Sequence, residues 1–211
     1  MQYIKLGKTG LEVSRICVGC MGFGDPEHWL HKWVVSEEQT HTVIRHAIEK
    51  GINFFDTANI YALGTSEEYV GSALKKFAKR DDVVLATKVH GRMTDGPNGG
   101  GLSRKAILAE VDNSLRRLQT DYIDLYQFHW PNRGSYMFRQ NWTFDPSKQN
   151  RVETLDHMIE TLEALQAAVD AGKIRAFGLS NESAWGTSEW LRLSEAGHGP
   201  RVVSIQNEYS L

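Results

Sequence analysis

The sequence predicts an α/β fold: a (β/α)8 barrel preceded by a β-hairpin, of which about six β/α units fall within the 211 residues. Short, almost wholly apolar segments alternate with amphipathic ones, which is typical of a parallel sheet covered by helices. Polar residues stand at the carboxyl ends of several apolar segments, where barrel enzymes carry their functional groups. We therefore expect a single, incomplete barrel domain over residues 1–211.

The apolar segments supply the expected strands. Tyr3–Leu6 and Leu11–Val13, on either side of Gly-Lys-Thr-Gly, predict a hairpin before the barrel. Six segments rich in β-branched residues follow and have the length of buried strands; they are 16–19, 53–57, 83–88, 123–129, 174–180 and 202–206. A complete barrel of this type needs about 250 residues, so we expect the native chain to continue past Leu211.

The amphipathic segments carry signals for the start and the end of helices. Ser36-Glu-Glu-Gln39 is a capping box, and Gly51 suits the left-handed residue that ends the helix. The other helices are expected to begin at Ser66, at Ser103, near Leu155 and after Ser183, and to end near Phe77, Leu118, Asp170 and Gly197.

The first strand-to-helix connection distinguishes between two possible folds, the barrel and the doubly wound sheet, which are both built of β/α units. Gly19-Cys-Met-Gly-Phe-Gly24 has the glycine spacing GxxGxG, and a long segment follows before the helix. A dinucleotide-binding doubly wound sheet needs GxGxxG in a tight turn that leads directly into a helix, so that the pyrophosphate meets the helix N-terminus. The barrel is therefore favoured.

Composition and charge argue against several classes of function. A net charge of −2 and an isoelectric point near 6.4 give no basic surface for nucleic acid or anionic lipid. No apolar run approaches the roughly 18 residues of a membrane span, and no basic segment leads into an apolar one at the N-terminus. We expect a cytoplasmic protein that acts on a small molecule, with homo-oligomerisation left open.

The two cysteines, Cys17 and Cys20, form a CxxC pair that invites a redox or zinc interpretation. A redox pair normally lies at a helix N-terminus, whereas this pair lies in an expected strand. Residues three apart on a strand point to opposite faces, so the two sulfurs should diverge. No further ligands at zinc spacing are evident, and His28 and His31 lack nearby carboxylate or cysteine partners. We expect structural thiols and no metal site.

Three successive strands are expected to end on polar side chains. Asp56 ends the second strand of the barrel, Lys88 the third and His129 the fourth, while Tyr61 lies five residues beyond Asp56. The carboxyl ends of neighbouring strands meet on one rim of a barrel, so these four side chains are gathered there. Each alone has an ordinary structural explanation, such as a helix cap, a surface lysine or a core histidine. Together they favour catalysis.

This combination of side chains suits the reduction of a carbonyl. A phenol with a pKa of about 10 is a poor acid at neutral pH unless its anion is stabilised, and a neighbouring ammonium stabilises that anion. The carboxylate keeps the lysine charged, and the imidazole can hydrogen-bond the substrate oxygen where negative charge develops. The assembly can polarise a carbonyl and protonate it. No side chain supplies hydride, so the reaction requires a cofactor.

Motifs along the whole chain add to this interpretation. They are Asp-Thr-Ala-x-x-Tyr at 56–61, Ser66-Glu-Glu-Tyr-Val-Gly71, Thr-Lys88, the run from Leu115-Arg-Arg-Leu to Gln-Phe-His129, Ala171-Gly-Lys-Ile-Arg175, Gly178-Leu-Ser-Asn181 and Ile205-Gln206. In these motifs the sequence resembles the aldo-keto reductase family, and in particular bacterial members of the group that includes the potassium-channel β subunits. Those subunits typically carry asparagine where this chain has His129, which favours a catalyst.

The resemblance implies a role for each residue of the site and NADPH (NADP+) as the cofactor. Tyr61 is implied to be the general acid, Lys88 and Asp56 to tune it, and His129 to orient the substrate. The residues implied to hold the cofactor are Asp56, the backbone of Cys20 and Met21, and the side chains of Ser180, Asn181 and Gln206. The loops that hold the cofactor phosphates in the family follow the seventh and eighth strands, beyond these residues.

The function expected is NADPH-dependent reduction of aldehydes and ketones to alcohols by hydride transfer. One alternative is a catalytically weak or inactive truncated barrel that senses the cofactor or binds a partner. Another is an aldolase-like enzyme that forms a Schiff base on Lys88. Asp56 argues against the aldolase-like enzyme, because the carboxylate keeps Lys88 charged.

The connection 132–154 is long for a barrel and contains four aromatic residues, Tyr136, Phe138, Trp142 and Phe144. Long aromatic loops on the catalytic rim often form substrate walls or lids. We hypothesise that this loop, together with Trp130, Trp29 and Trp33, shapes an aromatic pocket for aldehydes. Anchoring of the loop by its own aromatic side chains is an equally good explanation.

Overall fold

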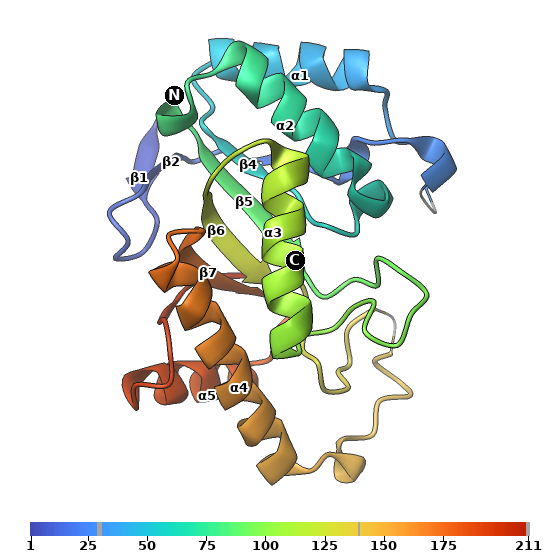
Figure 1. Cartoon of the computed structure of the whole chain (residues 1–211), viewed down its shortest axis with the longest axis vertical. Helices are drawn as coiled ribbons and strands as arrows, with labels where there is room; N and C mark the ends of the chain where they lie inside the picture. The colour runs from blue at the N-terminus through green and yellow to red at the C-terminus, as the bar shows by residue number, and fades with distance from the viewer. Residues whose placement is uncertain (29–30, 139, 210–211) are drawn as a thin grey trace.

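The computed structural model describes residues 1–28, 31–138 and 140–209. Six parallel strands form one sheet in chain order (Figure 1): β3 (Val18–Gly19), β4 (Phe54–Asp56), β5 (Val84–Val89), β6 (Ile123–Phe128), β7 (Ile174–Ser180) and β8 (Val202–Gln206). Each strand pairs with its neighbour in the sequence, so the sheet curls as part of a barrel. The strands β3 and β8 lie at its two edges.

Five α-helices connect the six strands and form an outer layer (Figure 1): α1 (Glu37–Glu49), α2 (Thr65–Phe77), α3 (Arg104–Leu118), α4 (Arg151–Asp170) and α5 (Ala184–Glu195). Each helix packs against the next one in the chain. Short 3-10 helices lie in the connections: η1 (Cys20–Gly22), η2 (Pro26–His28), η3 (Tyr61–Gly64), η4 (Arg80–Asp82) and η5 (Pro146–Lys148). No helix within the described residues is long and apolar enough to cross a membrane.

The helix boundaries follow local chemistry. Ser36 caps α1 in a reciprocal capping box with Gln39, as predicted, and the Ser103 hydroxyl accepts a hydrogen bond from the backbone N–H of Ala106 at the start of α3. The second helix is expected from the sequence to begin at Ser66, and α2 begins one residue earlier, at Thr65, with Gly64 as its N-cap. The buried Ser66 hydroxyl donates to the carbonyl oxygen of Cys20.

The predicted strands agree with the structure best toward the C-terminus. β7 and β8 have the predicted bounds, whereas β3 contains only Val18–Gly19 of the predicted 16–19. Ile16 is exposed at this edge, so the segment before Val18 is not the buried strand expected from its composition. The fourth helix begins at Arg151, four residues before the predicted start, because the Asn150 side chain caps it.

Alternate residues of the strands face the barrel interior, as the two-residue period of a strand requires. A small apolar layer of Ala86, Leu125 and Ala176 lies there, with Leu6, Phe54 and Val203 packed against it. Two residues further along three of these strands, the same face carries Asp56, Lys88 and Gln127. The interior therefore changes from apolar to polar toward the carboxyl ends of the strands.

A hairpin covers the other end of the interior. Its strands β1 (Tyr3–Lys5) and β2 (Glu12–Ser14) are antiparallel, as the sequence predicts. The turn contains Gly7 in the left-handed region, with φ of +55°, where a Cβ atom would come within 2.9 Å of the carbonyl oxygen of Val203. The hairpin thus contacts the last strand of the sheet, β8.

Candidate active site

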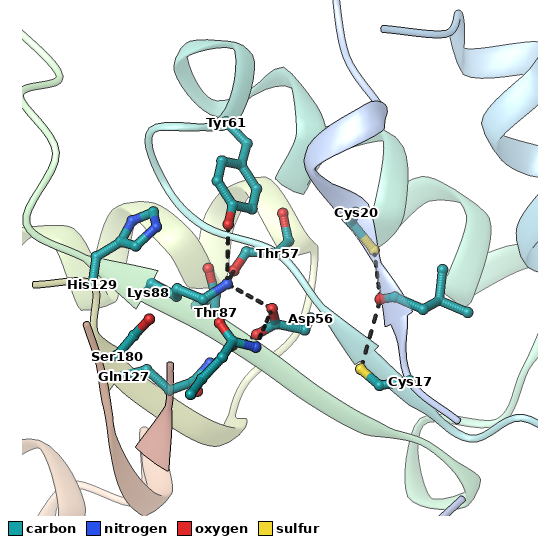
Figure 2. A network of polar contacts seen from close by, with 12 residues as sticks. Cys17, Cys20, Asp56, Thr57, Tyr61, Thr87, Lys88, Gln127, His129 and Ser180 are labelled. Atoms are coloured by element: carbon teal, nitrogen blue, oxygen red, sulfur yellow. Dashed lines mark hydrogen bonds and ion pairs between the residues drawn. The ribbon is translucent and has the colours of Figure 1, made fainter. Parts of the chain in front are cut away.

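Lys88 is the centre of the polar layer at the carboxyl ends of the strands. It is fully buried in β5, and its Nζ donates to Asp56 Oδ2 at 2.6 Å, to the carbonyl oxygen of Thr57 at 3.0 Å and to the hydroxyl of Tyr61 at 3.3 Å (Figure 2). Burial is the largest single influence and lowers the pKa of Lys88, but Asp56 and Tyr61, by charge and by hydrogen bonding, together outweigh it and the net pKa is raised. The buried amine is therefore a cation whose three acceptors fix its direction.

Asp56 is held by three donors. Besides Lys88, the side-chain amide of Gln127 donates to Oδ1 at 2.8 Å and that of Gln206 to Oδ2 at 3.1 Å. The carboxylate lies at the end of β4 and is 6% exposed. Burial of a charged group is tolerated only when the group is paired and hydrogen-bonded, so these donors compensate the burial of the carboxylate and orient it toward the amine.

The phenol of Tyr61 lies beside this ion pair. Burial is the largest influence and raises the pKa of Tyr61; the Lys88 ammonium opposes it and Asp56 adds to it, so the net pKa is raised. The Lys88 ammonium lowers the pKa of Tyr61, as predicted from the sequence for that contact, but burial raises the same pKa by more. Tyr61 therefore keeps its proton at neutral pH.

His129 directly follows β6 and faces Tyr61. The two ring centroids are 5.5 Å apart and the rings are nearly perpendicular. Burial, followed by the nearby charges of Lys88 and His90, lowers the pKa of His129 well below its usual range. The imidazole is therefore neutral at pH 7, with one ring N–H to donate and one ring nitrogen to accept a hydrogen bond.

A hollow of about 430 Å³ opens in front of the phenol and the imidazole. Most of the residues assigned to the site from the sequence line it: Met21, Tyr61, His129, Trp130, Ser180, Asn181 and Gln206. Lys88 lies behind Tyr61 and contacts its hydroxyl from the barrel interior, where Asp56 pairs with Lys88. The hollow therefore brings a proton donor, a neutral imidazole and side-chain amides to one space.

Two predicted cofactor contacts, Ser180 and Asn181, are linked to the backbone of His129. The side-chain amide of Asn181 donates to the carbonyl oxygen of His129 at 2.9 Å and to the Ser180 hydroxyl at 3.1 Å. The backbone of Asn181 is left-handed, with φ of +53°. Cys20 is fully buried and lies outside the lining of the hollow, whereas the adjacent Met21 reaches it.

The two cysteines do not diverge as the strand geometry predicted. Figure 2 shows both sulfurs directed at the carbonyl oxygen of Val18, at 3.8 Å from Cys17 and 3.4 Å from Cys20. The prediction was wrong because the strand ends at Gly19 and Cys20 begins the 3-10 turn η1. Both thiols are free, and burial raises the pKa of the Cys20 thiol well above its usual range. Such a thiol is a poor nucleophile or metal ligand at neutral pH.

Sequence reasoning missed two parts of the site. Gln127 orients Asp56, and the backbone carbonyl of Thr57 is one of three acceptors around the Lys88 amine. Gln127 had a detectable signal, because it is a polar residue within an apolar strand and lies two residues before His129, on the same face. The role of the Thr57 carbonyl has no sequence signal, since every residue carries a carbonyl group.

The aromatic loop contributes less to the hollow than we expected. Trp130 and Phe138 line it, and their rings meet edge to face with centroids 5.4 Å apart. Trp142, by contrast, is 97% exposed, and Trp33 is also exposed, so neither forms a wall. Trp29 lies outside the described residues. Within those residues, no three His, Cys, Asp or Glu side chains come together as metal ligands would.

Comparison with known proteins gives a consistent result. The sequence profile of the Aldo/keto reductase family matches residues 15–211. "Protein tas" of Escherichia coli (strain K12) is 37% identical over 225 aligned positions, which take in 100% of this chain and 61% of that protein. "Aldo-keto reductase YhdN" of Bacillus subtilis (strain 168) is 41% identical over 184 positions, covering 87% of this chain and 48% of that protein.

Solved structures show the same fold. The holo form of the aldo-keto reductase AKR11C1 from Bacillus halodurans superposes with a TM-score of 0.73 at 33% identity, covering 100% of this chain and 58% of that one. The chain thus spans between about half and two thirds of the length of the proteins it matches. The matches confirm the resemblance of the motifs and the predicted α/β barrel, present here in part. This chain belongs to the aldo/keto reductase family.

Proposed function

We propose that this chain carries the catalytic residues of an NADPH-dependent reductase that converts aldehydes and ketones to alcohols, with Tyr61 as the general acid. The observation that supports it best is the buried contact of Lys88 with both Asp56 and Tyr61. A buried ion pair is costly to build into a protein interior. One that ends against a phenol at the wall of a hollow therefore favours a functional role over a purely structural one.

In this proposal the proton moves from Tyr61 to the carbonyl oxygen of the substrate. Lys88 lies 3.3 Å from the phenol oxygen and stabilises the negative charge left there when the proton departs. Asp56 keeps the lysine charged and directed at the phenol. The neutral imidazole of His129 donates a hydrogen bond from its ring N–H to the same carbonyl oxygen, and this hydrogen bond orients the substrate. Trp130 and Phe138 pack against the remainder of the substrate.

The residues present fit a nicotinamide cofactor. Its carboxamide needs both hydrogen-bond donors and acceptors, and the side chains of Ser180, Asn181 and Gln206 offer both in the hollow beside Tyr61. When bound, the cofactor supplies the hydride that no side chain can provide. We also propose that the cofactor is NADPH in preference to NADH. Residues 1–211 are proposed to form one incomplete barrel domain.

The test is the Tyr61→Phe substitution, made in the full chain as its source produces it. Loss of the hydroxyl removes the proton donor, so we expect turnover of an aldehyde with NADPH to fall by at least about 10²-fold. NADPH affinity, measured by fluorescence titration, should change little. Tyr69→Phe on α2, away from the hollow, is the matched control and should leave turnover unchanged.

Other outcomes of this test would contradict the proposal. Turnover that survives Tyr61→Phe would remove Tyr61 from the role of general acid. NADPH binding without turnover in the unmodified protein would favour the second candidate, a cofactor-sensing or partner-binding barrel.

A further inference from the structure

The turn that carries Tyr61 has an unusual backbone. Three consecutive residues directly after it are left-handed, Ala62 with φ of +48°, Leu63 with +49° and Gly64 with +99°. A left-handed backbone is unfavourable for a non-glycine residue, so such residues persist only where the surroundings hold them. Ala62 is fully buried, whereas Leu63 is half-exposed. The position of the phenol therefore depends on whatever holds this turn.

Arg117, in the last turn of α3, lies directly against the turn. A Cβ atom on Gly64 would come within 2.7 Å of Arg117 Cδ, so the glycine allows the guanidinium stem to pass. The guanidinium continues to two carboxylates, with Nε donating to Glu67 Oε2 at 2.6 Å and Nη2 to Glu110 Oε2 at 3.2 Å. Arg117 thus links α3, on which it lies, to α2 through Glu67. It also contacts Glu110 on α3, and its stem passes directly against the turn.

The two carboxylates reach the catalytic residues from behind. Glu110 accepts a hydrogen bond at 3.0 Å from the side-chain amide of Asn59, two residues before Tyr61. Glu67 accepts one at 2.5 Å from the hydroxyl of Thr87, the residue before Lys88. The backbone N–H of Asn59 in turn donates to the carbonyl oxygen of Lys88 at 3.1 Å. The same network therefore holds the segments on both sides of the contact between Tyr61 and Lys88.

The network is buried and its members are ion-paired, which makes it stiff. Glu67 is fully buried, and the side chain of Arg117 is 11% exposed. Burial opposes the charge of Arg117, but the two carboxylates outweigh it and raise its pKa. Buried ion pairs are weak sources of net stability, and their best-supported use is to fix one arrangement of the chain. The arrangement fixed here is that of the strained turn.

We propose that Arg117, with Glu67 and Glu110, is a positioning group for Tyr61: it holds the left-handed turn 62–64 so that the phenol stays within reach of the Lys88 amine. This inference rests on the proposed role of Tyr61 as general acid. None of the three residues lines the hollow in front of Tyr61, so they act through the turn and not on the substrate.

Arg117→Met tests the proposal, because methionine retains most of the stem but removes both charged contacts. We expect kcat to fall by about 10- to 100-fold, since misplacement of a reacting group by an ångström has effects of this size. The KM for the aldehyde and the NADPH affinity should stay within about threefold of the unmodified protein. Arg116→Met, at the exposed neighbouring residue, is the matched control and should leave all three values unchanged.

Hydrogen exchange gives a second measurement that does not need activity. Peptides covering 58–64 should exchange faster in Arg117→Met, because the turn hydrogen bonds from Tyr61 N to Ala58 O and from Leu63 N to Ile60 O are loosened. Peptides covering 123–128 of β6 should be unchanged. If the protein proves inactive, the proposed function fails, yet this comparison still decides whether Arg117 holds the turn.

Two further variants keep the proposal testable if the Arg117→Met protein does not fold. Arg117→Lys and Glu110→Gln keep the shape of the network and weaken it, so each should lower kcat less than Arg117→Met and speed exchange of 58–64. An unchanged kcat and unchanged exchange at 58–64 in the folded variants would overturn the proposal. A loss of thermal stability alone, with kcat preserved, would also overturn it and leave Arg117 a purely structural residue.

Discussion

Burial makes the phenol of Tyr61 a weaker acid than a phenol in water, although the Lys88 ammonium lies 3.3 Å from its oxygen. A general acid must be protonated to act, so reduction should decline only as pH rises through the pKa of Tyr61, above the ordinary value of about 10. We expect kcat/KM for an aldehyde to be constant through neutral pH and to fall only in this alkaline range.

The measurement is a pH profile of kcat/KM at saturating NADPH, from neutral to alkaline pH. His129 provides the contrast, because its pKa is lowered well below 6.5 and it is neutral throughout this range. A decline with rising pH already near pH 6 to 7 would contradict the assignment of Tyr61. It would indicate that a group with an ordinary histidine pKa donates the proton.

The central contacts of the site were predictable from single residues, and the contacts around them were not. Asp56, Lys88 and His129 could be found because each is a polar residue at the end of an apolar strand. The hydrogen bonds from Gln206 and Gln127 to Asp56 depend on the register of β8 and β6, which the sequence does not specify. The prediction for Cys17 and Cys20 failed because β3 contains only Val18–Gly19, so Cys17 lies before the strand and Cys20 begins η1.

At the scale of elements, the connection between β6 and α4 is the part of the site that differs most from a minimal barrel. Trp130 at its start lines the hollow and contacts His90, His129 and Phe138 through its ring. We predict that Trp130→Ala changes the order in which aldehydes are preferred, by kcat/KM, more than it changes NADPH affinity. Loss of a large aromatic wall favours bulkier substrates over small ones.

The matched control for this prediction is Trp142→Ala in the same loop. Trp142 is 97% exposed, so its removal should leave the order of substrates unchanged. A panel of aldehydes of increasing size, assayed with both variants, measures the effect. If the ranking is the same in Trp130→Ala and the unmodified protein, Trp130 does not form part of the substrate pocket.

Elements with strong local signals were predicted closely. The apolar runs of β7 and β8 and the serine caps of α1 and α3 gave their bounds within about one residue. Errors arose where tertiary contacts replaced a local signal. Ser66 has the chemistry of a cap, yet its hydroxyl is used to join α2 to the backbone of Cys20, and Gly64 takes the capping position.

At the scale of the whole molecule, buried histidines predict a loss of stability in acid. Burial lowers the pKa of His90 from its usual 6.5 to about 4, and lowers those of His129 and His157 as well. Between pH 6.5 and 4 the unfolded chain binds protons that the folded chain does not. The free energy of unfolding therefore falls as pH decreases through this window, by up to about 3 kcal/mol for His90 alone.

Urea unfolding at a series of pH values from 7 to 4 measures this effect. His90→Gln should make the free energy of unfolding less dependent on pH in the window, because glutamine does not titrate. His46→Asn, on the exposed face of α1, is the control and should leave the slope unchanged. A slope that His90→Gln does not alter would contradict the assignment of acid sensitivity to this residue.

The contact of the N-terminal hairpin with β8 has a consequence for how the protein is made. It joins residues 7 and 203, nearly the full length of the sequence, whereas each strand from β3 to β7 pairs with one that follows it within a few tens of residues. On the ribosome, the hairpin emerges first but meets this partner only after residue 203 has been synthesised. Pairing of the central strands can proceed meanwhile, because folding begins with contacts that close short loops. The hairpin therefore makes its contact with β8 only after the strands β3 to β7 are available to pair.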